Sequence, residues 1–337
     1  GVEARVAGGR LDLADHDGTL EAGGRDRYPW IHVPAGYFKT MNNPGYDWCY
    51  KTEPVPGLNR KVVNWPRGKV LGGSSALNGL LYVRGQPQDY DRWRQMGNPG
   101  WGWDDVLPYF KRSEGNERGE DALHGATGPL GVSDPRYRHP ICDAWISAAR
   151  QAGYPANDDI NGATQEGVGY YQLTTRNGRR CSTAVAYLRP VKHRPNLRIL
   201  TRAQVRKVVL EGKRAVGVEI TDKAGETRIL RARREVILSS GAIGSPQILM
   251  LSGIGPADHL IQRTCADAGQ DFPHLLRVEG DQVDHLVGVA GELGAQALVL
   301  GADAHRAGVR LALTHHDATH GDQRGGADAV FLGPHHR

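Results

Sequence analysis

Residues 65–79 of the 337-residue chain read Trp65-Pro66-Arg67-Gly68-Lys69-Val70-Leu71-Gly72-Gly73-Ser74-Ser75-Ala76-Leu77-Asn78-Gly79. The two adjacent glycines let the backbone come close to a flat or charged ligand, because no Cβ stands in the way and a positive φ is allowed. The hydroxyls that follow, with the backbone N–H groups beside them, can donate to a phosphate or to ring acceptors. The pattern indicates a ligand-binding loop, although similar turns also occur where a chain only changes direction.

A second long motif begins where a buried-strand pattern ends. It reads Ser239-Ser240-Gly241-Ala242-Ile243-Gly244-Ser245-Pro246-Gln247-Ile248-Leu249-Met250-Leu251-Ser252-Gly253-Ile254-Gly255-Pro256. Together with Arg67–Ser75 and Asn78, in this order and at this separation, it resembles the two signatures of the glucose-methanol-choline (GMC) oxidoreductase family. The resemblance covers residues from about 20 to 256 and is closest to the choline and alcohol dehydrogenase branch.

The resemblance implies an α+β fold with two domains. An α/β Rossmann-like FAD-binding domain with an inserted β-meander would comprise residues 20–125 and 191–256. Residues 126–190 would form part of a mixed-sheet substrate domain. The family pattern does not extend to residues 1–19, an atypical N-terminal segment, or to residues 257–337, an atypical C-terminal tail of low order.

A set of residues falls on positions that hold FAD in the family. Glu21 would accept hydrogen bonds from the adenosine ribose, as acidic residues at strand ends do in dinucleotide-binding folds. Val205 would contact the adenine through its backbone, Gly241 would let the backbone pass near the cofactor, and Asn78 would offer its amide to the flavin. The full set is Glu21, Arg67, Val70, Leu71, Gly72, Gly73, Ser74, Asn78, Gly79, Val205, Ser240 and Gly241.

The implied activity is FAD-dependent oxidation of a CH–OH group, with hydride transfer to flavin N5. The substrate would be a small alcohol, choline-like or an aliphatic primary alcohol. Some members attach the flavin through a histidine at the position that Leu77 occupies here, so the FAD should be bound non-covalently. The sequence names neither the alcohol nor the electron acceptor, because oxygen and quinone users share these motifs.

Two family elements are missing from the sequence. No G-x-G-x-x-G precedes Glu21, where Gly8-Gly9 is the nearest glycine pair. The family's C-terminal His-Pro-x-Gly-Thr motif, which carries the catalytic base, is also absent, so no catalytic residue is assigned. The alternative is therefore a catalytically inactive remnant or binding scaffold with weak or no FAD affinity. Out-of-frame translation of a GC-rich gene would explain the composition of both terminal segments, and an intact single-frame gene would refute this hypothesis.

Several local patterns predict secondary structure in the first two thirds of the chain. Residues 90–114 have the pattern of two helices around a turn, and residues 141–153 have helical spacing. Residues 128–132 fit a short strand and residues 167–175 alternate as a longer one. Residues 28–64 favour a loop-rich segment that is held in place by the packing of its aromatic side chains. In the family, this region covers the flavin.

From residue 197 onward the pattern turns to short strands joined by tight turns. These strand patterns cover residues 197–201, 204–211, 214–221, 227–232 and 235–239. The last strand enters a Gly-Ala turn. Ser245 and Pro246 then favour a helix, with the serine as its cap and the proline at its first position.

The composition argues against several other classes. A net charge of +5 with interspersed acidic residues does not indicate nucleic-acid binding, and Arg231-Arg233-Arg234 is expected to be solvated. Four widely spaced cysteines indicate neither a zinc site nor a disulfide framework, which favours a reducing compartment. No transmembrane run and no signal peptide is expected. We therefore expect a cytoplasmic protein, in solution or peripheral to a membrane. A zinc site at His315, His316 and His320 is the disfavoured interpretation of the histidine-rich tail.

Overall fold

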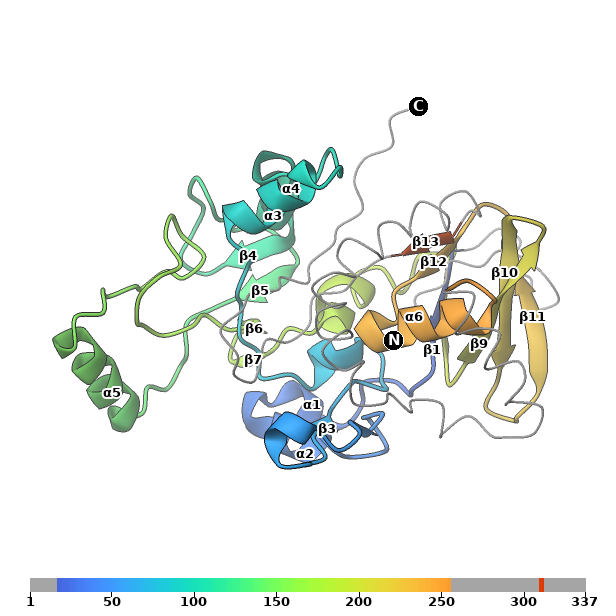
Figure 1. Cartoon of the computed structure of the whole chain (residues 1–337), viewed down its shortest axis with the longest axis horizontal. Coiled ribbons are helices and arrows are strands. Elements are labelled where there is room, and N and C mark those ends of the chain that lie inside the picture. Colours follow the sequence, from blue (N-terminus) through green and yellow to red (C-terminus); the bar gives the residue numbers. More distant parts are fainter. Residues whose placement is uncertain (1–16, 256–308, 312–337) are drawn as a thin grey trace. The chain divides into compact units, whose positions relative to one another are not determined.

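The computed structural model describes residues 17–255 and 309–311 (Figure 1). They form two compact units. The first comprises residues 17–25, 41–74, 191–255 and 309–311, and the second comprises residues 26–40 and 75–190. The functional division of the chain into FAD-binding and substrate domains stays a prediction.

The first unit is built around an antiparallel sheet in the order β11-β10-β9. Its strands are β9 (Gln204–Glu211), β10 (Arg214–Thr221) and β11 (Thr227–Arg231). Gly212 adopts φ +60° in the tight link between β9 and β10, and Gly225 adopts φ +84° in the next turn. Glycine takes these conformations without steric cost. The meander predicted from the sequence is confirmed to within one residue per strand.

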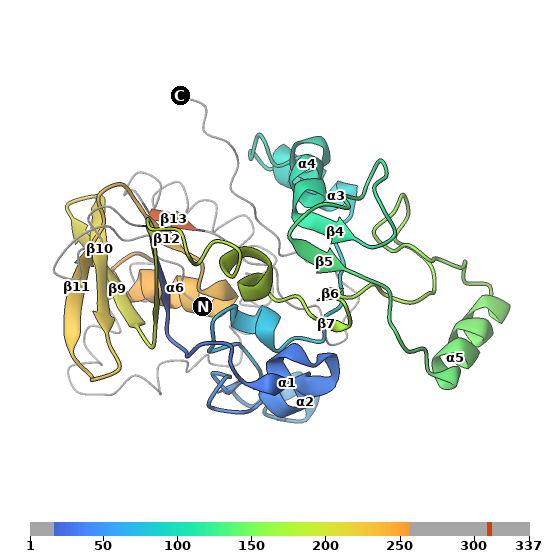
Figure 2. The ribbon, with the colours of Figure 1, turned by 180° about the vertical axis from the view of Figure 1, so that it is seen from behind.

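Two parallel strand pairs complete this unit. Strand β1 (Asp17–Glu21) pairs with β8 (Leu197–Thr201), and β12 (Val236–Leu238) pairs with β13 (Val309–Leu311). A short antiparallel pair joins β2 (Tyr50–Lys51) to β3 (Asn64–Trp65). Helix α6 (Gly241–Leu251) lies beside β9 in both views (Figures 1 and 2).

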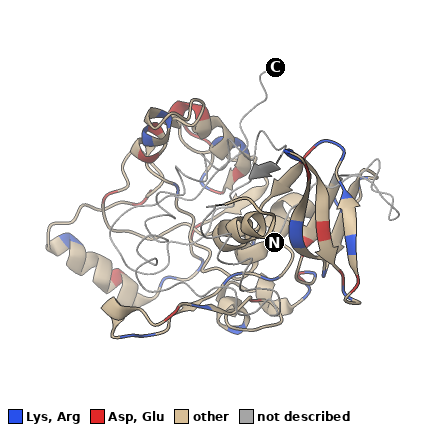
Figure 3. Ribbon diagram, turned by 45° about the vertical axis from the view of Figure 1, so that its right-hand side comes forward, with Lys and Arg blue, Asp and Glu red and all other residues tan. Residues whose placement is uncertain are grey.

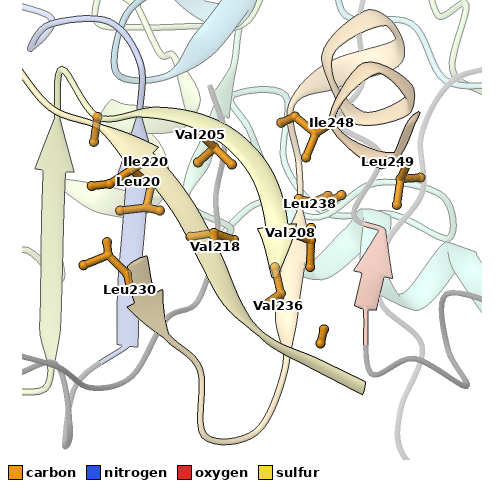
Figure 4. Close-up of a cluster of buried hydrophobic side chains, with 12 residues drawn as sticks. Leu20, Val205, Val208, Val218, Ile220, Leu230, Val236, Leu238, Ile248 and Leu249 are labelled. Carbon is orange, nitrogen blue, oxygen red and sulfur yellow. The ribbon is translucent and has the colours of Figure 1, made fainter. Parts of the chain in front are cut away.

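The core of the first unit lies between the meander, the parallel strands and α6 (Figure 4). Each element contributes the apolar residues that its pattern places on one side. Leu20 comes from β1, Leu238 from β12 and Ile248 from α6, and all three are at most 5% exposed. The others are Ala203, Val205, Val208, Ala215, Val218, Ile220, Leu230, Val236 and Leu249. Burying one such aliphatic side chain contributes about 1.5–3 kcal/mol.

Charged side chains of both signs lie on the strands of the meander (Figure 3). Glu219 is within 3.4 Å of Arg206 and 3.5 Å of Lys207, and Arg231 pairs with Glu211 at 2.6 Å. These pairs are largely exposed, and pairs of that kind contribute little to stability. Arg231, Arg233 and Arg234 are all exposed, as expected for a solvated cluster.

Helix α6 corrects one expectation. It begins at Gly241, so Ser245 and Pro246 lie inside it and do not start it. The Ser245 side chain is buried, and its Oγ accepts a hydrogen bond from the Ser240 N–H at 2.9 Å. This bond stabilises the first turn from inside the helix. The strand-to-helix connection is therefore shorter than the cap pattern predicts.

The second unit contains most of the helices. They are α1 (Pro29–His32), α2 (Tyr37–Thr40), α3 (Pro87–Gln95), α4 (Trp103–Ser113), α5 (Pro140–Gln151) and a π-helical turn (Ala184–Leu188). Helices α3 and α4 confirm the predicted helix–turn–helix. They pack through an aromatic cluster in which the Tyr90 ring lies 5.4 Å from Trp93 and 5.6 Å from Phe110, edge to face.

The strands of the second unit are short. Strands β4 (Glu114–Asn116) and β5 (Leu130–Val132) pair in parallel, and β6 (Thr175–Arg176) pairs with β7 (Arg179–Arg180). The strand predicted over residues 167–175 is wrong. In that range Val168 and Leu173 make isolated bridges, and a ladder begins only at Thr175. The segment is irregular, and within it the buried Gln172 bonds to Asn116 in a polar cluster.

That polar cluster is a buried charge network. Glu114 is fully buried and accepts hydrogen bonds from Arg84 and from the Gly125 N–H. The Nδ1 atom of His124 lies 3.0 Å from Glu114 Oε1, and its Nε2 atom lies 3.1 Å from Asp159 Oδ2. Because a neutral imidazole can donate from only one of its two nitrogens, two facing carboxylates favour the protonated ring.

This network should make stability depend on pH in two directions. The hydrogen bond to Glu114 raises the pKa of His124 above its usual 6.5. Stability from this histidine is present below pH 6.5 and is lost as the pH rises through the raised pKa. For Glu114, burial alone would raise the pKa, but the bond from His124 and the charge of Arg84 outweigh it and lower the pKa below 4.5. Its contribution is present above 4.5 and is lost as the pH falls through the lowered pKa.

We therefore expect the free energy of unfolding to be highest at mildly acidic pH, between 4.5 and 6.5, where both contributions are complete. Urea unfolding at a series of pH values measures it. In His124→Gln the decline on the alkaline side should disappear, because the side chain no longer titrates. A decline of equal size in this variant would show that another group is responsible.

Candidate cofactor site

Glu21 is the last residue of strand β1, at the carboxyl end of the parallel pair with β8. Its carboxylate is 2% exposed, and Oε1 accepts a hydrogen bond of 2.6 Å from the Gly23 N–H. The Glu21 carbonyl accepts from Ala203 at 3.0 Å. The side chain is therefore fixed at the strand end and is not a solvated turn glutamate.

The chain after Glu21 lies directly against residues 67–74, the part of the predicted ligand-binding loop that we call the glycine loop. Gly24 forms a parallel bridge with Val70, and the Leu71 N–H donates to the Gly24 carbonyl at 2.9 Å. A Cβ at Gly23 would lie 1.8 Å from the Lys69 carbonyl oxygen. The strand end and the loop can approach this closely only because residue 23 has no side chain. Glu21, Val70 and Leu71, three of the predicted residues, are thus brought together.

The glycine loop is closed by its own hydrogen bonds. The Gly68 N–H donates to Ser74 Oγ at 2.9 Å, and the Gly73 N–H donates to the Val70 carbonyl at 2.7 Å. Gly72 and Gly73 have φ values of +97° and +55°. A Cβ at Gly68 would lie 2.2 Å from the Gly73 carbonyl. The loop therefore presents backbone at a site that larger residues could not form.

Asp47 supports this loop and was missed by the sequence motifs. It is 1% exposed, and its carboxylate accepts backbone N–H bonds from Asn42 at 2.6 Å, Cys49 at 2.9 Å and Arg67 at 2.8 Å. Because one carboxylate accepts from all three N–H groups, the segment from Asn42 to Cys49 is held against Arg67, at the start of the glycine loop. The signal available in the sequence was an aspartate following the turn residues Asn43-Pro44-Gly45.

Aromatic side chains pack beside the loop. The Trp48 and Tyr50 rings are stacked with centroids 5.9 Å apart, and Lys69 Nζ lies 4.5 Å from the Trp48 centroid. Burial raises the pKa of Tyr50 to about 12, so its phenol is neutral at physiological pH. These contacts are packing, as expected for this aromatic segment. A cover over a flavin remains a prediction.

Ser240 and Gly241 mark the junction between β12 and α6. Gly241 has φ +79°, a conformation that favours glycine. The Ser240 N–H is held by Ser245, but Ser240 Oγ is buried without a hydrogen-bond partner among the described residues. A buried hydroxyl in this state is costly unless something else bonds to it. A ligand with polar atoms would satisfy it.

Val205, the predicted adenine contact, is a core residue of β9 with 1% exposure. Its side chain packs with the other residues of Figure 4. The role predicted for it concerns the backbone, and that role stays a prediction. It lies in the same unit as Glu21, the loop up to Ser74, Ser240 and Gly241.

Asn78 and Gly79 belong to the second unit. The Oδ1 atom of Asn78 accepts a hydrogen bond of 2.6 Å from Arg180 Nη1. Arg180 is 2% exposed and also donates to the carbonyls of Ile31 at 2.8 Å and Ser75 at 3.2 Å. This arginine, which the motifs did not indicate, fixes the amide orientation of Asn78 so that its NH₂ group points away from the guanidinium.

The described residues of the first unit fit a dinucleotide cofactor in three respects. A carboxylate stands at the end of a parallel strand, a glycine-built loop lies against it, and a buried hydroxyl lacks a partner at a helix start. Gly8 and Gly9 lie outside the described residues, as do His315, His316 and His320 of the disfavoured zinc interpretation. Within residues 17–255 and 309–311, no group of three or more His, Cys, Asp or Glu is arranged for a metal ion.

Comparison with known proteins shows the family of the chain. The model of the family described as GMC oxidoreductase matches residues 14–322, and so reaches beyond the stretch from 20 to 256 that carries the motifs. The chain belongs to the GMC oxidoreductase family. It is 48% identical over 255 residues to an oxygen-dependent choline dehydrogenase of Sinorhizobium medicae, covering 76% of the chain and 46% of that relative. It is also 48% identical over 277 residues to the mitochondrial choline dehydrogenase of Mus musculus, covering 79% and 45%.

Solved structures share the fold. Pyridoxine 4-oxidase from Mesorbium loti aligns with a TM-score of 0.70 and 35% identity over 76% of this chain and 52% of that one. An FAD-dependent oxidoreductase from Chaetomium thermophilum aligns with a TM-score of 0.68 and 31% identity, over 76% and 48%. The α+β fold class is thus confirmed. The chain spans about half the length of the relatives it matches.

Among the helices of the described residues, none is long and apolar enough to cross a bilayer.

Proposed function

We propose that this GMC chain contributes the cofactor-binding part of an FAD-dependent oxidoreductase that acts on a small primary alcohol of the choline type. When bound, FAD supplies the hydride acceptor for oxidation of the CH–OH group. The proposal rests on the position of Glu21 at a parallel strand end, packed against the glycine loop. It is supported by 48% identity to choline dehydrogenases.

Each predicted residue then has a defined task. The Glu21 carboxylate accepts hydrogen bonds from ribose hydroxyls, and Val205 offers its backbone to the adenine. Backbone groups of residues 70–74 bind beside the flavin, with Arg67 fixed at the start of the loop by Asp47. Ser240 Oγ donates to the cofactor, and Gly241 allows the backbone to approach it.

In the second unit, Asn78 donates its NH₂ group to the flavin edge, because Arg180 already occupies its oxygen. Gly79 leaves open space beside it, since a Cβ there would meet no atom within 4 Å. Leu77 is buried and offers no nucleophile, which supports non-covalent FAD. Acid precipitation should release all flavin into the supernatant.

The visible spectrum of the purified chain, after incubation with FAD and removal of the excess, tests cofactor binding. We expect one flavin per chain. Glu21→Gln should weaken binding roughly 10- to 100-fold, because charge-assisted hydrogen bonds contribute about 1.5–3 kcal/mol. Glu211→Gln is the control, since that glutamate is exposed on β9. A colourless wild-type protein would contradict the proposal.

A dye-linked assay with choline and short aliphatic alcohols tests the substrate class. Stoichiometric flavin without bleaching by any alcohol would reduce the proposal to a cofactor-binding scaffold. Bleaching by choline ahead of ethanol would support the choline branch.

A further inference from the structure

The hairpin formed by β2 and β3 exposes apolar side chains over its outer part, residues 56–65, which we call the tip segment. All residues of this segment are exposed. The large apolar ones are Leu58 at 51%, Val62 at 51%, Val63 at 40% and Trp65 at 38% exposure. Because neighbouring side chains on a paired arm point to opposite faces, exposure of both valines means that neither face of the hairpin is covered. A contiguous apolar surface of this kind marks an interaction site.

Backbone hydrogen bonds fix the hairpin that carries the tip segment. Lys51 pairs with Asn64 in the β2–β3 ladder, and the Val55 N–H donates to the Lys61 carbonyl at 3.1 Å. The Lys61 N–H donates to the Leu58 carbonyl at 3.1 Å and closes the tip. The apolar side chains are therefore held in an ordered ribbon and stay in contact with water, which is unfavourable until an apolar phase or partner covers them.

The tip segment is also basic. Arg60 and Lys61 are both exposed, and residues 56–65 contain no Asp or Glu. Lys51 is exposed at the base of the hairpin, whereas Glu53, the acidic residue of its first arm, is partly covered. Apolar side chains beside basic ones are complementary to an anionic bilayer, because its headgroup surface is negative and its interior is apolar.

We propose that the tip segment binds the surface of an anionic lipid bilayer. Leu58 and Val62 enter the boundary between headgroups and acyl chains, and Arg60 and Lys61 contact the lipid phosphates. Trp65 suits the same place, since tryptophan is enriched at the interface between membrane and water. The surface lies outside all the predicted cofactor residues, so the proposal does not depend on FAD binding.

Two other occupants fit the tip segment less well. A second copy of this chain in a two-fold dimer would bring the same patch of both copies together, and Arg60 and Lys61 would then face like charges. An acidic protein would match the two basic residues but would leave the apolar side chains in water. A bilayer satisfies both parts of the surface at once.

Co-sedimentation of the full chain with lipid vesicles tests the proposal by measuring the partition coefficient. We expect wild type to bind vesicles of equal phosphatidylcholine and phosphatidylglycerol. Binding should be roughly 10-fold weaker in about 0.5 M salt, because salt screens the attraction between the basic residues and the lipid. Vesicles of phosphatidylcholine alone should bind as weakly, since they carry no net charge.

Arg60→Gln with Lys61→Gln removes the charge of the tip segment. This variant should bind the anionic vesicles roughly 30-fold more weakly and lose most of the salt dependence, because each basic residue near such a surface contributes about a fivefold factor. Lys213→Gln with Arg214→Gln is the matched control, an exposed basic pair at the turn between β9 and β10. It should bind like wild type.

Leu58→Ser with Val62→Ser removes the apolar part. Binding to the anionic vesicles should fall roughly 30-fold, because two apolar side chains no longer leave water, and the remaining binding should keep its salt dependence. Ile229→Ser, at a residue 45% exposed on β11, is the control and should bind like wild type.

Urea unfolding should give wild-type midpoints for both double variants, because all four substituted side chains are exposed. Failure of wild type to bind the anionic vesicles would overturn the proposal, as would equal losses in the variants and their controls. Two further results would do the same in a protein that does not bind vesicles. One is self-association that Leu58→Ser with Val62→Ser abolishes, and the other is binding to polyglutamate that this variant retains.

Discussion

Gly23→Ala is expected to destabilise the first unit by about 3 kcal/mol, the upper range for overpacking. The added Cβ would lie 1.8 Å from the Lys69 carbonyl oxygen and 2.5 Å from the Val70 nitrogen. Both are backbone atoms that cannot rotate away, so the strand end and the glycine loop must separate. Urea unfolding measures the loss of stability, and the FAD absorbance of the same protein should be abolished.

Gly24→Ala is a matched control one residue away. The nearest atom to its added Cβ is Arg202 Nε at 4.0 Å, at the end of a flexible side chain. We expect stability and flavin content to stay within error of wild type. If both variants behave alike, the close approach of Gly23 to the loop is not what holds the site together.

Arg84→Met should lower the free energy of unfolding by about 3–5 kcal/mol, the cost of removing one partner of a buried ion pair. Arg84 is 4% exposed and donates to Glu114, to the Leu123 carbonyl at 2.7 Å and to the Tyr82 hydroxyl at 3.2 Å. Methionine fills a similar volume, but it provides neither the positive charge nor the hydrogen bond that Arg84 gives the Glu114 carboxylate. Chemical denaturation at neutral pH measures the difference.

Two comparisons make this prediction specific. Arg136→Met breaks a pair with Glu117 in which the arginine side chain is 62% exposed, and it should change stability by less than about 1 kcal/mol. The double variant Arg84→Met with Glu114→Gln should be less destabilised than the sum of the single variants, because the unpaired charge is gone. Additive losses would indicate that the two side chains act independently.

The sequence predicted local elements where the apolar pattern and turn residues agreed. The meander from residue 197 onward has alternating or continuous apolar strands and glycines in its links, and the structure follows it closely. The pattern at 167–175 failed because alternation also arises in an irregular segment. Gln172, for example, is a buried polar residue whose side chain exchanges hydrogen bonds with that of Asn116 at 2.9 and 3.0 Å. The spacing of apolar residues cannot predict that a polar side chain is buried.

The sequence likewise predicted some residues of the candidate site and missed others. Glu21 and the glycine loop follow from motifs, since the chemistry needs those residue types at those places. Asp47 and Arg180 could not be found in this way, because each acts through backbone groups that are distant in sequence. Asp47 reaches Arg67, and Arg180 reaches Ile31. Their importance comes from the tertiary contacts, which a single sequence does not display.

The pairing of β1 with β8 has a consequence for biosynthesis. Asp17 pairs with Leu197, so about 180 residues must leave the ribosome before β1 finds its partner. At a synthesis rate of roughly 5–20 residues per second, β1 and its Leu20 side chain stay without this partner for about 10–40 s. Closing so long a loop is also entropically slow. The β1–β8 pair of the first unit therefore forms only after Leu197 has been synthesised, and its yield in cells should depend on chaperones that shield nascent chains.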